Sequence, residues 1–199
     1  MERVDLKKEH RDLYAATAKV KEVRPGAGTF LAADGVGEPG GGGYQEALEK
    51  LFALAYTAKF RLKKARVLDF GVPNVECLWY DDPKEKPMSE WRWRLLIRIP
   101  DGVTEEHLAE ARAELAERKG LDASSVRRIE HVEGRALQTL HVGPYQELGS
   151  TYARLAAAAE ETGLVLEGPG HEVYLSDPRR TDPAKLKTIV RMPVKGGKP

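Results

Sequence analysis

The sequence contains a single cysteine, Cys77, so the chain cannot form an internal disulfide bond. A chain without a disulfide framework is typical of a reducing compartment, and we expect a cytoplasmic protein. No stretch approaches the roughly 18 consecutive apolar residues of a membrane-spanning helix. The first residues, Met1–Glu9, also lack the apolar core of a secretory signal. These absences together favour a soluble globular protein.

The sequence also lacks an excess of charge of either sign. It has 32 basic and 31 acidic residues, which gives a formal net charge of +1. Such a balance provides no electrostatic footprint for nucleic acid or an anionic membrane, and we expect neither as a direct partner. The five histidines show no ligand-type pairing such as His-x-x-x-His, and no serine or cysteine motif for acyl transfer occurs. We therefore expect no metal and no cofactor.

Glycine is concentrated in one short stretch, Gly35–Gly43, which holds six glycines and one proline. This stretch lacks the Lys-Ser/Thr pair of a phosphate-binding loop and the spacing of a dinucleotide fingerprint. Regular structure is expected to stop there. We interpret the stretch as a flexible rim that gates a neighbouring cleft.

The second half of the chain repeats the order of elements in the first half. Each half is expected to form a strand, a helix and two further strands. The last strand of each half ends in the pattern Arg-x-Pro: Arg98-Ile99-Pro100 and Arg191-Met192-Pro193. Repeat one spans about 25–100, with strands at Ala27–Asp34, Val75–Tyr80 and Trp91–Ile99 and a helix at Tyr44–Lys59. Repeat two spans about 126–194, with strands at Ala136–Val142, His171–Leu175 and Leu186–Met192 and a helix at Glu147–Thr162.

A further helix is expected between the repeats, at about 104–119. Thr104 is a good N-cap, and Gly120 follows two basic residues at the other end. A hairpin is expected around Glu133-Gly134, joining Val126–Glu133 to the first strand of repeat two. Residues 1–24 are highly charged and are expected to form an N-terminal arm on the domain, anchored by Leu6, Leu13 and Tyr14.

These elements predict a single α+β domain over residues 1–199. Tandem βαββ repeats would form a two-layer sandwich, with an antiparallel sheet on one side and helices on the other. The strand Trp91–Ile99 alternates apolar and basic residues, so its arginines Arg92, Arg94 and Arg98 are expected on a solvated sheet face. Two repeated units meet at an interface, which we call the seam, and interfaces between packed units are common sites for ligands. We therefore expect a ligand cleft between the repeats.

Two glutamates occupy similar places in the two repeats. Glu172 and Tyr174 share one face of their strand because side chains alternate with a period of two. If that face lines the cleft, burial raises the pKa of Glu172 and prepares it for acid–base work or for a cationic ligand. The alternative is a solvated glutamate at a sheet edge. Glu76 is the counterpart, either as a second carboxylate of the cleft or as an ion-pair partner of Arg92 or Arg94.

Aromatic residues are few but clustered near these glutamates. The three tryptophans, Trp79, Trp91 and Trp93, lie within fifteen residues, and at least one is expected in the core while others line the pocket. Wide rings beside a carboxylate suit a flat aromatic or cationic ligand. Tyr145 would either donate a hydrogen bond to a ligand or pack the start of the helix that follows it. Tyr56 is expected in the core or at the pocket floor.

The order of several motifs resembles the GyrI-like small-molecule-binding family. The motifs span about residues 25–194 and are specific as a set: Ala55–Phe60 (AYTAKF), Glu76–Tyr80 (ECLWY), Gln138–Tyr145 (QTLHVGPY), His171–Thr181 (HEVYLSDPRRT) and Leu186–Val194 (LKTIVRMPV). The resemblance implies tandem βαββ units with a ligand cleft between them. It favours Glu172 in the cleft over the solvated alternative.

The stand-alone subgroup that the chain resembles includes enzymes that hydrolyse cyclopropane-containing DNA-alkylating compounds inside an aromatic cage. Cys77 stands where that subgroup tends to have glycine, and Tyr80 replaces a second tryptophan, so the shape of the cage and the substrate stay open. The resemblance implies candidate catalytic residues at Glu172, Glu76 and Tyr145. The candidate ligand-binding residues are Trp79, Trp91, Trp93, Tyr174, Tyr56 and His171.

The expected function is binding of a xenobiotic-like aromatic or cationic small molecule, with or without hydrolysis and without a cofactor. Two other functions remain open at this point. One is a ligand sensor or sequestering protein that uses the same pocket without chemistry. The other is an interaction module that binds a larger partner such as a topoisomerase. The sequence sets neither the natural ligand nor the oligomeric state.

Overall fold

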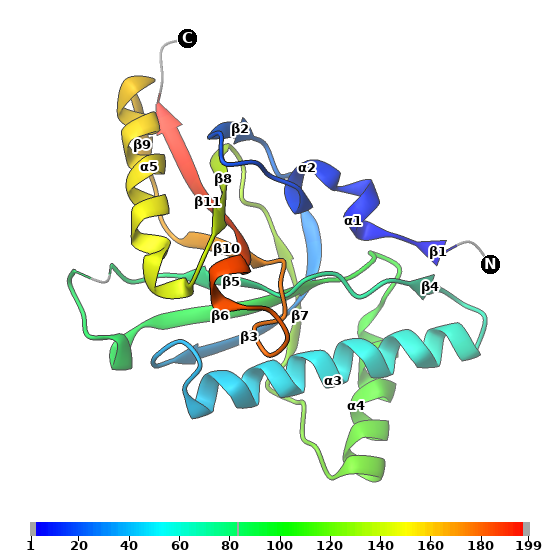
Figure 1. Cartoon of the computed structure of the whole chain (residues 1–199). Coiled ribbons are helices and arrows are strands. Elements are labelled where there is room, and N and C mark those ends of the chain that lie inside the picture. Colours follow the sequence, from blue (N-terminus) through cyan, green and yellow to red (C-terminus); the bar gives the residue numbers. More distant parts are fainter. Residues whose placement is uncertain (1–2, 83, 197–199) are drawn as a thin grey trace.

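A curved antiparallel sheet organises the computed structural model, which describes residues 3–82 and 84–196 (Figure 1). Its eight-strand path runs in the order β2 (Lys21–Val23), β8 (Ala136–Val142), β11 (Lys187–Gly196), β10 (Gly170–Tyr174), β5 (Glu76–Trp79), β6 (Arg92–Arg98), β3 (Gly28–Val36) and β7 (Arg127–His131). A ninth strand, β9 (Leu164–Leu166), pairs with the end of β11. Every neighbouring pair in this sheet is antiparallel.

The seam of the repeat lies between β10 and β5, which pair antiparallel at the centre of the sheet. Repeat one contributes β5, β6 and β3 to one side, and repeat two contributes β10, β11 and β8 to the other. Each repeat has one helix between its first two main strands: α3 (Gly42–Lys64) in repeat one and α5 (Leu148–Glu161) in repeat two. The predicted α+β fold of tandem βαββ units is confirmed.

The helices cover one face of the sheet. The buried face of α3 packs on the inward residues of β3 and β6, while α5 packs on β8 and β11. The connecting helix α4 (Glu105–Lys119) packs against α3, and Thr104 and Gly120 cap it as expected. Figure 1 shows α3 along the half of the sheet that holds β5, β6 and β3, and α5 beside the half that holds β8 and β11. The seam lies where these two halves meet.

The opposite face carries the N-terminal arm (Figure 1). The arm contains β1 (Arg3–Val4), α1 (Leu6–Glu9) and α2 (Arg11–Tyr14), and β1 pairs in parallel with β4 (Asp69–Phe70). The three predicted anchors, Leu6, Leu13 and Tyr14, are all buried. Leu13 and Tyr14 pack against Val173 and Ile189 on this side of the seam. The arm thus makes the second face of the sheet an interior surface.

Two expectations about the sheet are wrong. The strands on either side of Gly134 form no hairpin, because β7 pairs with β3 at one end of the sheet and β8 pairs with β2 and β11 at the other. Residues 132–135 instead cross between the two halves, and Gly134 has a φ of 78°, which suits the turn. The arginine stripe of β6 is not wholly solvated either, since Arg98 is only 7% exposed beneath the arm.

Short 3₁₀ turns lie in three of the loops: η1 (Met88–Glu90) between β5 and β6, η2 (Tyr145–Glu147) between β8 and α5, and η3 (Pro183–Lys185) between β10 and β11. The expected irregular stretch is shorter than predicted, since β3 continues to Val36 and α3 begins at Gly42. The described helices include none that is long and apolar enough to cross a membrane.

Gly35 makes room for the indole of Trp93, its partner across the β3–β6 pair. A Cβ added at Gly35 would lie 2.2 Å from Cη2 of Trp93. Trp93 is 2% exposed and packs edge to face against Tyr44, with 5.1 Å between ring centroids. We expect Gly35→Ala to lower the free energy of unfolding by about 1–3 kcal/mol, the usual cost of overpacking a core. Urea unfolding of the variant measures this loss.

The matched control for this prediction is Gly43→Ala in the first turn of α3. A Cβ there meets no heavy atom within 4 Å, so the change is expected to be neutral or slightly stabilising. Equal losses of stability in the two variants would contradict the role assigned to Gly35.

Candidate functional site

The pairing register at the seam sends the two glutamates to opposite faces of the sheet. Glu172 lies directly opposite Cys77, and Glu76 lies opposite Val173. The two repeats are thus offset by one residue at these strands, and a one-residue offset exchanges the faces. Neither alternative for Glu76 is therefore right: it does not share a face with Glu172, and it pairs with His171, whereas Arg92 and Arg94 pair with aspartates. Glu172 faces the helices, whereas Glu76 faces the N-terminal arm.

Glu172 is the polar centre of a group of aromatic residues on the helix side. We call this group the seam aromatic cluster; its members are Tyr44, Trp79, Trp91, Tyr145, Tyr152, Glu172 and Tyr174. The hydroxyl of Tyr152, on α5, donates to Oε1 of Glu172 at 2.9 Å. The hydroxyl of Tyr174 donates to Oε2 at 2.8 Å. Nε1 of Trp79 in turn donates to the hydroxyl of Tyr174 at 3.3 Å.

The aromatic rings of the cluster pack against one another in pairs. Tyr44, on α3, stacks on Trp79 with an interplanar angle of 5° and 5.9 Å between centroids. Trp79 meets Trp91 edge to face at 5.9 Å. Tyr145 meets Tyr174 edge to face at 5.6 Å. Both repeats and both helices thus contribute aromatic surface to one site.

The charge of Glu172 has no cationic counterpart in the cluster. Burial raises the pKa of this carboxyl, and the hydrogen bonds from Tyr174 and Tyr152 only partly offset that rise. Glu172 is 6% exposed, and within residues 3–82 and 84–196 no lysine, arginine or histidine forms an ion pair with it. A buried carboxyl in such surroundings either receives a proton from a reacting group or attracts a cationic ligand.

Local sequence explains why these side chains meet. Gly170, on β10, leaves space for Tyr152, because a Cβ there would lie 2.8 Å from the tyrosine hydroxyl oxygen. Nδ2 of Asn74 donates to the backbone carbonyl of Tyr174 at 2.7 Å and holds the end of β10 against repeat one. The period-two alternation then directs Glu172 and Tyr174 to the same side.

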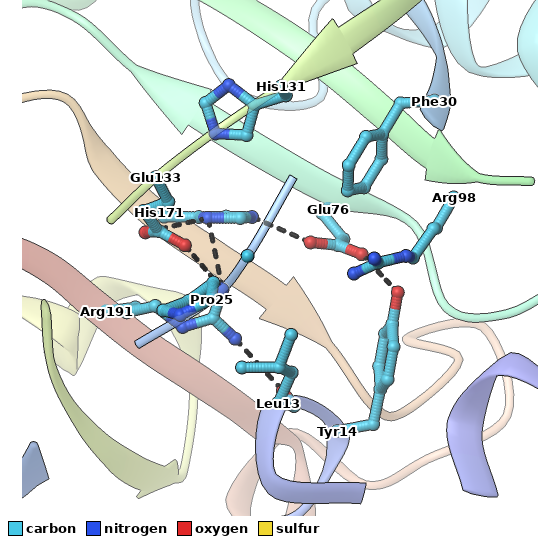
Figure 2. A pocket seen from close by; sticks show the side chains of 11 residues that line it. Leu13, Tyr14, Pro25, Phe30, Glu76, Arg98, His131, Glu133, His171 and Arg191 are labelled. Carbon is cyan, nitrogen blue, oxygen red and sulfur yellow. Dashed lines mark hydrogen bonds and ion pairs between the residues drawn. The ribbon is translucent and has the colours of Figure 1, made fainter. Parts of the chain in front are cut away.

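A second polar group lies behind the seam, on the arm side (Figure 2). We call it the back-face charge cluster; its members are Tyr14, Glu76, Glu133, Gln138, His171 and Arg191. Nε2 of His171 bonds Oε2 of Glu76 at 2.8 Å, and its Nδ1 bonds Oε1 of Glu133 at 3.0 Å. Nη1 of Arg191 donates to Oε2 of Glu133 at 2.7 Å.

The arm closes this second cluster. The hydroxyl of Tyr14 donates to Oε1 of Glu76 at 2.6 Å, and Nη2 of Arg191 donates to the carbonyl of Leu13 at 3.0 Å. Nε of Arg191 also donates to the side-chain oxygen of Gln138 at 2.9 Å. Each charged member is buried and hydrogen-bonded, so the cluster satisfies the conditions under which a fold tolerates interior charge.

The back-face charges compensate one another. Burial alone would lower the pKa of His171, but the carboxylates of Glu133 and Glu76 outweigh it and raise the pKa to about 9. Burial would raise the pKa of Glu133, yet His171 and Arg191 lower it to about 2. The same histidine holds the pKa of Glu76 below its ordinary value despite burial. Two cations therefore face two anions at neutral pH, which points to a structural role.

The structure thus brings together five of the nine candidate residues: Glu172, Tyr174, Trp79, Trp91 and Tyr145. Glu76 and His171 belong to the back-face charge cluster instead. Trp93 is a core residue beneath Tyr44, as expected of at least one tryptophan. Tyr56 lies neither in the core nor at a pocket floor, because it is 42% exposed on α3 between Phe52 and Phe60.

Sequence reasoning missed several members of the two clusters. Tyr44 and Tyr152 fall on the apolar faces of their helices, and a tyrosine at such a position signals a hydroxyl that needs a buried partner. Glu133 and Arg191 carried no comparable signal, since their contacts join residues 58 positions apart. Across the described ranges, no group of three or more His, Cys, Asp or Glu side chains is arranged to hold a metal ion.

Comparison with known proteins places this architecture in one family. The GyrI-like small molecule binding domain matches residues 27–195. The hydrolase encoded by lin2189 from Listeria innocua is 36% identical, with a TM-score of 0.90 over 98% of this chain and 100% of that chain. An uncharacterized conserved protein from Listeria innocua is also 36% identical, with a TM-score of 0.91 over 96% and 100%. No curated protein sequence matches significantly.

A more distant structure shares the fold alone. The C-terminal domain of EcmrR is 19% identical, with a TM-score of 0.56 over 90% of this chain and 98% of that domain. The match over residues 27–195 includes both repeats, both helices that flank the seam and every member of the seam aromatic cluster. The chain belongs to the GyrI-like small molecule binding domain family.

Proposed function

We propose that the chain binds an aromatic, electrophilic or cationic small molecule against the seam aromatic cluster, and that it hydrolyses cyclopropane-containing compounds there. The observation that supports this most is Glu172: a buried carboxyl with a raised pKa, surrounded by aromatic rings and without a cationic partner among the described residues. Flat rings bind by stacking, and a positive centre over a ring face and beside a carboxylate is attracted to both.

The proposed reaction adds one water molecule to a strained ring. The water oxygen forms a bond to a cyclopropane carbon, and the ring bond at that carbon breaks. The electron pair of the broken bond moves to the conjugated carbonyl oxygen of the substrate, which takes up a proton to become a phenol. Glu172 would accept the proton from the attacking water. Tyr145, which is half-buried and packs edge to face against Tyr174, would donate a hydrogen bond to the developing oxyanion.

The similarity to a hydrolase supports the chemical part of this proposal. That Listeria innocua protein is 36% identical over almost the whole chain. The competing function is sequestration without chemistry. It is favoured by one observation: both oxygens of Glu172 already accept a tyrosine hydroxyl, so the carboxylate is arranged as a fixed counter-ion.

Mass spectrometry of a cyclopropanoid alkylator incubated with the purified protein distinguishes the two. We expect a product heavier by one water, formed at a rate proportional to enzyme concentration. Glu172→Gln is expected to lower that rate by about 100-fold or more, as general bases contribute roughly 10²–10⁴-fold. Glu76→Gln is the matched control, and we expect it to keep the rate per folded molecule.

If the alkylator keeps its mass but still quenches tryptophan fluorescence, the protein sequesters the compound and does not hydrolyse it. Hydrolysis that survives in Glu172→Gln and disappears in a folded Glu76→Gln would place the reaction on the arm side. If the protein shows no turnover and no binding of the alkylator, the proposed ligand class is refuted.

A further inference from the structure

A small cavity lies beside the back-face charge cluster, under the segment that joins the arm to β3 (Figure 2). Its volume is about 10 Å³, which is room for one water molecule or one small ion. Pro25 and Gly26 form part of its wall, and Phe30, Arg98 and His131 form another part. The cavity is on the opposite face of the sheet from the seam aromatic cluster, so it is independent of the function proposed above.

Arg98 presents an unpaired guanidinium to this cavity. The side chain is 7% exposed, and over the part of the chain that the structure describes it forms no ion pair with a carboxylate. Its polar contact is one long hydrogen bond from Nη2 to the carbonyl of Ala27, at 3.4 Å. A guanidinium has five N–H donors, and leaving them unpaired in a buried place is costly.

The fold builds a cradle for this cation. Its Cζ lies 5.4 Å from the centre of the Phe30 ring, as in a cation–π contact. A Cβ at Gly28 would lie 2.6 Å from Nη2 of Arg98, so glycine at this position leaves room for the guanidinium where it lies. These two contacts position Arg98 over the cavity without neutralising its charge.

His131 forms a further part of the wall of the cavity. The ring is held edge to face against Phe30, with 6.0 Å between centroids, and against His171 at 6.2 Å. Figure 2 shows His131 at the rim above the back-face charge cluster. Burial lowers the pKa of His131, so the ring is neutral near pH 7 and adds no charge to the wall of the cavity.

The charges around the cavity sum to an excess of one cation. The lining holds Arg98, Arg191 and His171 as cations and Glu76 and Glu133 as anions. Arg191 and His171 are paired with the two carboxylates, so the excess belongs to Arg98. A monovalent anion is the ligand that balances this arrangement.

We propose that this cavity binds a small monovalent anion of the size of chloride, held by the guanidinium of Arg98. The anion would lie between β3, β7 and the segment that follows the arm. It would therefore hold residues 25–26 against the sheet and stabilise the folded state.

Thermal unfolding in two salts tests the stabilisation. Sodium chloride and sodium gluconate are compared at equal ionic strength, because gluconate is too large for the cavity. For the wild type we expect the midpoint of unfolding to be about 2–4 °C higher in chloride than in gluconate. Arg98→Leu is expected to lose this difference, whatever its own stability. Arg94→Leu removes a positive charge on the same strand and face but outside the cavity. We expect this control variant to keep the difference between the salts.

Crystals of the wild type grown in sodium bromide test the position directly and need no variant. We expect an anomalous peak in the cavity, within hydrogen-bond distance of the Arg98 guanidinium. A cavity that holds only water, or an equal salt effect in Arg98→Leu and the wild type, would overturn the proposal.

Discussion

Glu172→Gln is expected to weaken the binding of an aromatic cation by about 10–100-fold, while a neutral compound of the same shape changes by less than about threefold. Hydrogen bonds and contacts to a charged, partly desolvated group are each worth about 1.5–3 kcal/mol, and about 1.4 kcal/mol corresponds to tenfold. The variant keeps the shape of the side chain and removes only its charge. Quenching of Trp79 and Trp91 fluorescence gives both affinities, because these rings lie in the seam aromatic cluster.

The pH profile of cation binding carries the same information. Since burial raises the pKa of Glu172, the carboxylate is lost at a higher pH than that of an ordinary glutamate. Affinity for a permanently charged ligand should therefore fall as the pH decreases through that raised pKa. Affinity for the neutral compound, and for either compound in Glu172→Gln, should stay flat. A parallel loss for charged and neutral ligands would argue against an inward-facing carboxylate.

Glu133→Gln is expected to lower the free energy of unfolding by about 3–5 kcal/mol, the usual result of removing one partner from a buried ion pair. Glu133 contacts both His171 and Arg191, whose side-chain nitrogens lie 3.4 Å apart. Without the carboxylate, two cations would remain side by side in the interior. Urea unfolding of the variant measures the loss, and Glu130→Gln on the exposed side of β7 is the control, expected within about 0.5 kcal/mol of the wild type.

The linkage between charge and stability adds a second readout for this variant. His171 has an ordinary pKa of 6.5 and a folded pKa of about 9, so its contribution is fully present below pH 6.5 and is lost as the pH rises through about 9. We expect the stability of the wild type to fall between pH 7 and 10, and that of Glu133→Gln to fall less. Identical slopes for the two proteins would contradict the assigned pairing.

The elements of this fold are largely predictable because their signals are local. Helical periodicity, the Thr104 and Gly120 caps and the alternation of β6 each depend on a few neighbouring residues. The division into two βαββ units follows from the order of those elements. The failed hairpin at Gly134 shows the limit: two adjacent strands carry the same signal whether they pair with each other or with β3 and β11.

The candidate site was only partly predictable for a related reason. The alternation within β10 places Glu172 with Tyr174, and that depends on one strand. The position of Glu76 relative to Glu172 depends on the register between β5 and β10, where a shift of one residue reverses the face. The partners of Glu76 are remote as well, since Tyr14 lies 62 residues and His171 lies 95 residues away in the sequence.

The two glutamates therefore have different roles, because they lie on opposite faces of the sheet at the seam. Glu172 lies where both repeats and both flanking helices supply aromatic rings, and its charge has no partner there. Glu76 lies where the arm, a histidine and an arginine complete a balanced charge cluster. The first arrangement is suited to a ligand, and the second is suited to holding the arm on the sheet.

A crystal structure of the wild type with a bound aromatic cation tests the central claim most directly. We expect the ligand on the helix side of the seam, with its rings against Trp79 and Tyr44 and its positive centre beside the carboxylate of Glu172. A ligand bound on the arm side beside Glu76, or on the exposed face of α3 at Tyr56, would show that the seam aromatic cluster is not the binding site.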